Sequence, residues 1–325
     1  MLRSLTAFRR YAWGLLGYTI LVILWGGFVR ASGSGAGCGN HWPLCNGEII
    51  PHSPALNTLI EFSHRLTSGM AGILAILLAV WAFFAFGRKT PVFRASVAVL
   101  VFMMLEGAVG AGLVLFEYVA YNPSIARAYW MAAHLTNTFF LLAALTLAAW
   151  WASGGHLPRF RGNGRSKWMM LASLLGLLVL GASGAVTALG DTLAISGGFD
   201  PAQNAVVGTL TGLRIYHPIL ACSVFVLVAA TVFLSERRSS ATSRFGRRVV
   251  GLMLIQLLIG LANVQLHAPV GIQLVHLLMT NLIWIGFILF SAESLPTDSS
   301  ESVENVIQPV AAPDHVFDRL PGNSV

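Results

Sequence analysis

The sequence predicts an all-α integral membrane protein, with eight transmembrane helices that form two pseudo-symmetric four-helix bundles. Composition is the first observation behind this prediction: 56% of the 325 residues are hydrophobic and only 10% are charged. A soluble domain carries about 25% charged residues, so an ordinary soluble protein is excluded. The net charge of +7 comes mainly from cations placed to set membrane topology. We therefore expect membrane lipid, and not nucleic acid, as a partner.

Eight long apolar runs are the second observation, because a helix needs about 20 mostly apolar residues to cross a bilayer. We expect the spanning helices at Tyr11–Val29, Thr58–Phe86, Val92–Phe116, Arg127–Trp151, Trp168–Leu189, Thr211–Leu234, Arg247–Leu266 and Pro269–Ala292. Residues 293–325 are rich in Ser, Pro, Asp and Glu, and are predicted to form a disordered cytoplasmic tail.

Positive charges orient these helices. Sixteen of the 20 Lys and Arg residues lie before the first helix, in the connections after the second, fourth and sixth helices, or in the tail. The positive-inside rule places that side, and both termini, in the cytoplasm. Four cations remain at the outer ends of helices: Arg30, Arg65, Arg127 and Arg214. Either anionic groups at the outer surface or contacts with lipid headgroups account for them.

Similarity between the two halves is the third observation. The aligned pairs are His64 with His217 at an offset of 153, His134 with His276 at 142, Glu106 and Gly110 with Gln256 and Gly260 at 150, and Gly27–Gly33 with Gly184–Gly190 at 157. We therefore expect a duplicated unit, with residues 1–155 as the first half and residues 156–292 as the second. Four helices per half make the halves parallel, related by an axis along the membrane normal.

Four histidines carry the main functional signal: His64, His134, His217 and His276. Each lies in an even-numbered predicted helix, about 10 Å below its outer end. One intramembrane histidine is often a packing residue, but four at matched depth in repeat-related positions favour a ligand role. Two imidazoles facing each other across a bundle suit a bis-histidine haem. Zinc would require three or four converging ligands, which a pair does not supply.

The two halves differ one turn above the first histidine of each pair. Glu61 precedes His64 by three residues, whereas Arg214 precedes His217 by three. A carboxylate beside a haem can accept protons during an oxidation, and a cation suits a haem propionate. This asymmetry predicts a substrate site in the first half and an electron-handling haem in the second. A charge favoured by the helix dipole is the alternative explanation for Glu61.

Two further features leave alternatives open. Cys38 and Cys45 lie in a glycine-rich loop on the predicted outer, oxidising side, so we expect a disulfide there. A structural staple and a redox-active pair are both compatible with that placement. Glu106 lies midway along the third predicted helix as a buried carboxyl group, and its role stays open between packing and function.

The residues above resemble the haem A synthase family. The resemblance is carried by Gly26-Gly-Phe-Val-Arg-Ala-Ser-Gly33, Cys38 and Cys45, Glu61-Phe-Ser-His64-Arg65, Val186-Thr-Ala-Leu-Gly-Asp191-Thr192, Arg214-Ile-Tyr-His217 and Gln273-Leu-Val-His276-Leu. It covers the chain up to about residue 292. Glu106 departs from the pattern, since an amide like Gln256 is expected there.

The resemblance implies an oxidoreductase that converts haem O to haem A, by oxidising a ring methyl to a formyl group through successive hydroxylations. It implies Glu61 as the catalytic carboxylate, His64 and His134 as ligands of the substrate haem, His217 and His276 as ligands of a haem b that relays electrons, Arg65 and Arg214 as propionate partners, and a Cys38–Cys45 disulfide. It also implies a location in the bacterial inner membrane, a haem O synthase that supplies the substrate, and an electron acceptor whose identity the sequence does not give. A homo-oligomer is compatible with it.

Two other classes of function compete with this interpretation. A non-catalytic bis-histidine di-haem protein that exchanges electrons with quinone would hold two permanent haems and convert neither. A transporter with duplicated halves would bind no haem and would leave the matched histidines unexplained. The haems extracted from the purified protein distinguish the three.

Overall fold

The structure is a computed structural model that describes residues 2–155, 157, 164–235 and 240–295. Within these ranges it is helical apart from the connections, where Cys45 and Glu48 form an isolated bridge. The elements are α1 (Leu2–Ala31), η1 (Ser34–Ala36), α2 (Leu56–Phe86), α3 (Pro91–Leu115), α4 (Ile125–Ala152), α5 (Gly164–Asp191), η2 (Thr192–Ser196), α6 (Ala205–Leu213), α7 (Tyr216–Ser235), α8 (Ser240–Gln265) and α9 (Val270–Ser294).

Eight helical segments of the described chain are long enough and apolar enough to cross a membrane. The predicted fold class is therefore confirmed, and each expected span falls on one of these segments. Most observed helices extend a few residues beyond the expected ends; α2, for example, begins at Leu56 and not at Thr58. Three ends lie one residue inside the expected spans: those at Leu115, Gln265 and Val270. The predicted tail lies outside the described residues from position 296 onward, and residues 293 and 294 still belong to α9.

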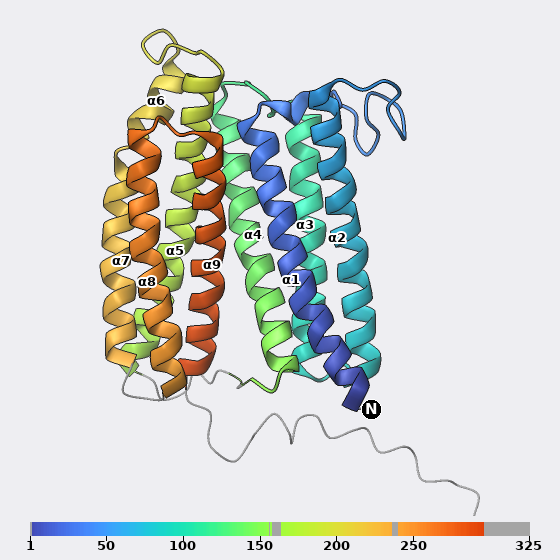
Figure 1. The fold of residues 1–325 in the computed structure, drawn as a ribbon, viewed down its shortest axis with the longest axis vertical. Helices are drawn as coiled ribbons and strands as arrows, with labels where there is room; N and C mark the ends of the chain where they lie inside the picture. The colour runs from blue at the N-terminus through green and yellow to red at the C-terminus, as the bar shows by residue number, and fades with distance from the viewer. Residues whose placement is uncertain (1, 156, 158–163, 236–239, 296–325) are drawn as a thin grey trace, which may run out of the picture.

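The helices form two groups side by side (Figure 1). In the first group α1 packs on α2, α2 on α3, α3 on α4, and α4 on α1. In the second group α5, α7, α8 and α9 pack in the same cyclic way, and the short α6 lies over α5 at the upper end of the molecule. The groups meet where α4 packs against α5 and α9, and where α1 packs against α9.

Aromatic side chains fill the contact between the two groups. The rings of Phe139 on α4 and Trp284 on α9 stack with centroids 4.9 Å apart. The Trp284 Nε1–H also donates a 2.7 Å hydrogen bond to the Phe139 carbonyl oxygen. Gly181 on α5 allows this approach, because a Cβ there would lie 2.3 Å from Cε2 of Phe139. The shared core therefore fixes α4, α5 and α9 relative to one another.

The sixth span differs from the single helix that its hydropathy predicts. The chain forms α6 first, breaks at Arg214 and Ile215, and restarts as α7 at Tyr216. Pro218 explains the restart, because proline lacks an N–H and is tolerated only in the first turn of a helix. The break places His217 in the first turn of α7, three residues after Arg214.

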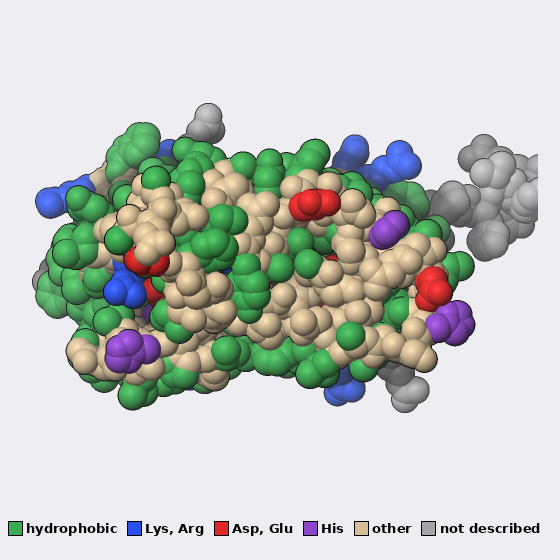
Figure 2. All heavy atoms as spheres, turned by 90° about the horizontal axis from the view of Figure 1, so that it is seen from above, with side chains coloured by type: hydrophobic (Ala, Val, Ile, Leu, Met, Phe, Trp, Pro, Cys, Tyr) green, Lys and Arg blue, Asp and Glu red, His purple; other side chains and the backbone are tan. Residues whose placement is uncertain are grey.

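The end of the molecule seen from above carries the loop of residues 32–55 and the break between α6 and α7. Hydrophobic side chains rim the long sides in this view, while histidine, acidic and basic side chains lie among exposed backbone on the end itself (Figure 2). This distribution suits an end that faces water and sides that face lipid. We call it the loop end below.

Candidate functional site

The structure brings the four predicted histidines together as two pairs, one in each helix group. His64 on α2 lies within electrostatic range of His134 on α4, and His276 on α9 lies within the same range of His217 on α7. All four rings are partly exposed, even though they project from packed helices. Each of the four histidines therefore keeps some accessible surface.

The ring nitrogens show which atom each histidine presents. In His64, His134 and His276 the buried nitrogen without an aligned hydrogen bond is Nδ1. In His217 the Nδ1 atom lies 2.8 Å from the hydroxyl of Ser183 on α5. Nε2 is thus the nitrogen left accessible on every ring, as an axial metal ligand requires.

Glycines on the neighbouring helices lie against three of the rings, near the Cε1 atom of each. A Cβ on Gly26 of α1 would lie 2.9 Å from Cε1 of His64. The corresponding distances are 3.2 Å from Gly184 of α5 to His217 and 3.3 Å from Gly260 of α8 to His276. The sequence alignment pairs Gly27 with Gly184, but by ring contact Gly26 is the equivalent residue, so the structural offset is 158.

These features fit haem better than a bare metal ion. Within the described residues there is no cluster of three or more His, Cys, Asp or Glu side chains that would hold a metal ion. Paired imidazoles with accessible Nε2 atoms and side-chain-free helix faces beside them are what a planar macrocycle with two axial ligands needs. In the first half the pair would be His64 and His134, and in the second His217 and His276.

The fourth histidine ring has a charged neighbour and no glycine against it. Nδ1 of His134 lies 2.7 Å from Oε2 of Glu106 on α3. Oε1 of the same carboxylate accepts a 2.9 Å hydrogen bond from Nδ2 of Asn137, one turn further along α4. The sequence predicted a buried carboxyl group at position 106; the structure leaves its side chain 15% exposed and places it against a candidate ligand.

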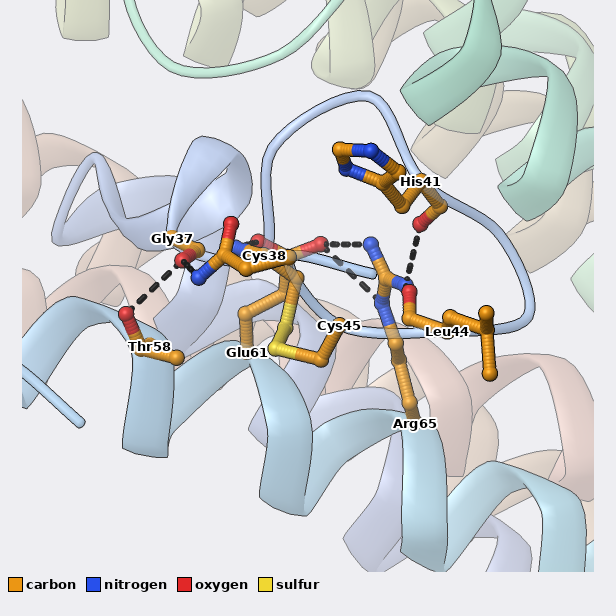
Figure 3. Close-up of polar contacts among 9 residues, drawn as sticks. Gly37, Cys38, His41, Leu44, Cys45, Thr58, Glu61 and Arg65 are labelled. Atoms are coloured by element: carbon orange, nitrogen blue, oxygen red, sulfur yellow. Dashed lines mark hydrogen bonds and ion pairs between the residues drawn. A yellow bond between two sulfur atoms is a disulfide. The ribbon is translucent and has the colours of Figure 1, made fainter. Parts of the chain in front are cut away.

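Glu61 is almost fully buried, with 3% of its surface exposed, and both of its oxygens are engaged (Figure 3). Oε2 accepts a 2.8 Å hydrogen bond from the backbone N–H of Cys38. Oε1 accepts from Nε and Nη2 of Arg65, one turn along α2. Glu61 thus joins the disulfide loop to the helix that carries His64.

The loop is held on the start of α2 by several further contacts. Cys38 and Cys45 form a disulfide across a separation of seven residues. Nη1 of Arg65 donates to the carbonyl oxygens of His41 and Leu44 at 2.7 and 2.6 Å. The loop therefore covers Glu61 and is anchored by the arginine that pairs with it.

Gly37 provides the closest approach between the loop and α2. Its carbonyl oxygen accepts a 2.7 Å hydrogen bond from the Thr58 hydroxyl. A Cβ at position 37 would lie 2.4 Å from the backbone of Asn57, so only glycine fits there.

The two arginines predicted as propionate partners lie in different settings. All three nitrogens of the Arg65 guanidinium contact Glu61 or the loop carbonyls. Arg214 is half exposed and forms a 2.9 Å ion pair with Asp191 at the end of α5. Both stay predictions as propionate partners, and Arg214 has the larger accessible surface.

Arg30 is a residue whose role the sequence did not reveal. From the end of α1 it reaches the second helix group, where Nη1 donates to the carbonyl oxygen of Ala188 and the hydroxyl of Thr192, and Nη2 to Oε1 of Gln273. The distances are 2.9, 2.6 and 2.7 Å. The sequence marked it only as one of four outer cations in a glycine-rich stretch, and its acceptors are protein groups of the second helix group.

Ser183 and Asn137 were also missed. Each contacts a candidate ligand or its neighbour from within an apolar helix. Small polar residues inside spanning segments are a recognised signal. They are common enough, however, that only the fold shows which of them face a histidine.

Taken together, the fold and the paired histidines define a polytopic membrane protein with two intramembrane imidazole pairs. A family model described as cytochrome oxidase assembly protein, COX15-CtaA, matches residues 9–288. The chain therefore belongs to the COX15-CtaA family, and the resemblance to haem A synthases is confirmed.

Relatives agree with this assignment. A heme A synthase of Halalkalibacterium halodurans is 29% identical over 273 residues, which cover 82% of this chain and 89% of that protein. One from Exiguobacterium sp. is 42% identical over 98 residues, 30% of this chain and 33% of that protein. A protoheme IX farnesyltransferase of Thermus thermophilus is 46% identical over 295 residues, 88% of this chain but 48% of that protein. The chain thus spans about half the length of the Thermus relative.

Proposed function

We propose that the protein is a haem A synthase, which oxidises a ring methyl of haem O to the formyl group of haem A. The observation that carries this proposal is the asymmetry between two similar imidazole pairs. The first pair has a buried carboxylate, Glu61, one turn above His64, and the second has the cation Arg214 one turn above His217. Two identical electron-transfer sites would not need this difference.

The reaction consists of two hydroxylations at one carbon. The methyl group gains a hydroxyl, the resulting alcohol gains a second, and loss of water leaves the aldehyde. With water as the formal oxygen donor, the conversion of methyl to formyl releases four electrons and four protons. The electrons must pass to an acceptor in the membrane, and the protons to a base beside the carbon.

The residues divide between these tasks. His64 and His134 hold the substrate haem O, and Glu61 accepts protons with its charge stabilised by Arg65 and the Cys38 N–H. His217 and His276 would hold a haem b, which would supply a one-electron relay. Arg214 would bind a propionate of that haem in place of part of its contact with Asp191. On the substrate side, Arg65 would bind a propionate in place of part of its contacts with Glu61 and the loop carbonyls.

A protoheme IX farnesyltransferase is the partner that this function requires. The product of farnesyl transfer to protoheme is an apolar haem, which is delivered most readily within the membrane. The Thermus relative bears that enzyme's name and is about twice as long as the region matched here. We therefore propose that a farnesyltransferase works beside this region in the bacterial inner membrane, with both termini of the given sequence in the cytoplasm.

The test is to express the chain in a host that makes haem O but no haem A. Haems are then extracted from the purified protein and separated by chromatography. Haem A, or a mixture of haem O and its hydroxylated form, supports the proposal. Haem B alone indicates the electron-transfer alternative, and no haem at all contradicts both.

Glu61→Gln tests the role of the carboxylate. We expect haem A formation to fall at least about 100-fold, as for loss of a general base, while the second-half haem stays bound. Glu48→Gln removes a carboxylate from the exposed part of the same loop and is the matched control, with activity unchanged. Haem A formation at the unaltered rate in the Glu61→Gln protein would show that the proton acceptor lies elsewhere.

A further inference from the structure

We propose that Glu106 is a positioning residue that holds His134 with Nε2 toward the first-half iron and makes that site harder to reduce than the second-half site. This inference rests on the proposed function, because it assigns a direction to the electron flow which that function needs. It concerns a residue on α3, outside the helices that carry the ligands of either half.

The carboxylate is fixed from two sides by α4. Oε2 lies 2.7 Å from Nδ1 of His134, and Oε1 accepts a 2.9 Å hydrogen bond from Asn137. The same Asn137 amide donates to the carbonyl oxygen of Phe102, one turn before Glu106 on α3. The Nδ1 approach is close but bent away from a straight hydrogen bond, and such contacts often align only when the ligand binds. With Oε2 as acceptor, Nδ1 carries the proton and Nε2 faces the iron.

The second half lacks this arrangement at every equivalent position. Gln256 replaces Glu106, and its amide donates to the His276 carbonyl oxygen and the Thr280 hydroxyl, not to the ring. At the offset of 142 that aligns the two histidines, Met279 replaces Asn137. The carboxylate and the amide that holds it are therefore present together in the first half and absent together from the second.

The ring positions differ in the same sense. His276 lies against Gly260, with its Cε1 atom 3.3 Å from where a Cβ would be. Gly110, the equivalent of Gly260, has no atom within 4 Å of its Cβ position. In the first half the ring of His134 instead contacts Glu106, one turn earlier on α3. The replacement of Glu106 by Gln256 thus goes together with a different position of the ligand ring, His134 in the first half and His276 in the second.

A carboxylate on the outer nitrogen of a ligating histidine raises the basicity of the nitrogen that binds the metal. Stronger donation stabilises the oxidised metal, so the reduction potential falls. In the second half the ring of His217 contacts the neutral hydroxyl of Ser183. The nearby carboxylate of Asp191 acts on His217 without a hydrogen bond to the ring and is paired with Arg214. The charged partner therefore sets the first-half potential below that of the second, and electrons released in the first half move downhill to the second.

The test is a spectroelectrochemical titration of the purified protein with haem in both halves, comparing the unaltered chain with Glu106→Gln. We expect the midpoint potential of the first-half haem to rise and the gap between the two haems to narrow, with the second-half potential unchanged. Glu117→Gln removes a carboxylate that contacts Asn40 near the loop end and no histidine, and is the control for loss of charge. Equal potentials in the unaltered protein, or no shift in Glu106→Gln with both haems bound, would overturn the inference.

A second variant covers the case in which Glu106→Gln loses the first-half haem. Asn137→Ala keeps the carboxylate but removes the amide that holds it, and we expect a smaller upward shift of the same potential. If that potential does not move, the inference is wrong. Failure of the proposed function is scored separately, by haem extraction, because the titration reports ligand chemistry whether or not haem O is converted.

Discussion

At the scale of a single residue, Gly26 shows that a position without a side chain can be needed to place a ligand ring. Its α-carbon faces the His64 ring so closely that an added Cβ would lie 2.9 Å from Cε1 and 3.1 Å from Nε2. Carbon atoms do not approach that closely, so the ring must move. Since the ring is the proposed ligand, its displacement should affect haem binding before it affects folding.

We therefore expect Gly26→Ala to lower first-half haem occupancy by about 10-fold or more, as changes around metal ligands do. Gly17→Ala is the matched control in the same helix, because no atom lies within 4 Å of its Cβ position. That substitution should leave haem binding unchanged and stabilise the helix by up to about 1 kcal/mol. The pyridine haemochrome spectrum of each purified variant measures occupancy. Full occupancy in Gly26→Ala would mean that His64 does not bind iron in the position described.

Ser183 makes the equivalent prediction for the second half. Its hydroxyl lies 2.8 Å from Nδ1 of His217 and also donates to the carbonyl oxygen of Leu180. Ser183→Ala should weaken second-half haem binding by about 10-fold through loss of ring orientation. Ser173→Ala, in the same helix but paired with Thr231, should leave it unchanged. Haem titration of the apoprotein measures both, and equal affinities would remove Ser183 from the site.

At the scale of an element, the loop that carries the disulfide is a cap on the start of α2. Its backbone uses Glu61 and Arg65 as anchors, while the disulfide closes it on itself. A cross-link over so short a loop contributes about 2–3 kcal/mol by limiting the unfolded chain. The larger consequence is local, because Cys38 is also the residue whose N–H contacts the Glu61 carboxylate.

Cys38→Ser should therefore loosen the loop and expose Glu61, while the helices stay folded. We expect faster proteolysis between residues 39 and 50, a loss of about 2–3 kcal/mol in unfolding free energy, and haem A formation reduced to a similar extent as in Glu61→Gln. Cys222→Ser, at the exposed free cysteine on α7, is the control. If Cys38→Ser alters stability but not activity, the disulfide acts only as a staple.

Sequence patterns predicted the elements well because hydropathy reports a local property. Eight apolar runs predicted eight spans, and each run falls on one helical segment long and apolar enough to cross a membrane. Contacts between distant helices carry no such local signal. Glu106 contacts His134, and Glu61 contacts the loop, because of how the helices rotate and pack. Local hydropathy and residue spacing do not determine that packing.

The break before α7 shows the same limit in a different way. The apolar run continues through Arg214 and Ile215, so a single helix was expected. The helix instead breaks at these two residues, because Pro218 is tolerated only in the first turn of a new helix. The result matters for the site because His217 lies in the first turn after the break. A proline inside an apolar run is a readable signal, and it could have placed the break from the sequence alone.

At the scale of the whole molecule, Arg30 fastens one helix group to the other. It is the last-turn cation of α1, and its three hydrogen bonds end on α5, η2 and α9. It also interacts electrostatically with Asp191, which pairs with Arg214 above the second histidine pair. The residue thus connects the first group to the rim of the second site, so that the relative placement of the two sites depends on it.

Arg30→Ala should cost about 3 kcal/mol, because charged hydrogen bonds are lost and their buried acceptors are left without donors. Arg30→Lys should recover only part of this, since an ammonium group lacks the fork geometry of guanidinium. Arg10→Ala, an exposed cation at the other end of α1, should change stability by less than about 0.5 kcal/mol. Thermal unfolding in detergent measures the three, with a melting temperature about 5–10 °C lower expected for Arg30→Ala.

Because Arg30 also fixes the spacing of the two sites, Arg30→Ala should slow electron transfer between their haems even below the melting temperature. If transfer is as fast as in the unaltered chain, the stacked Phe139 and Trp284 rings alone must hold the two groups in register.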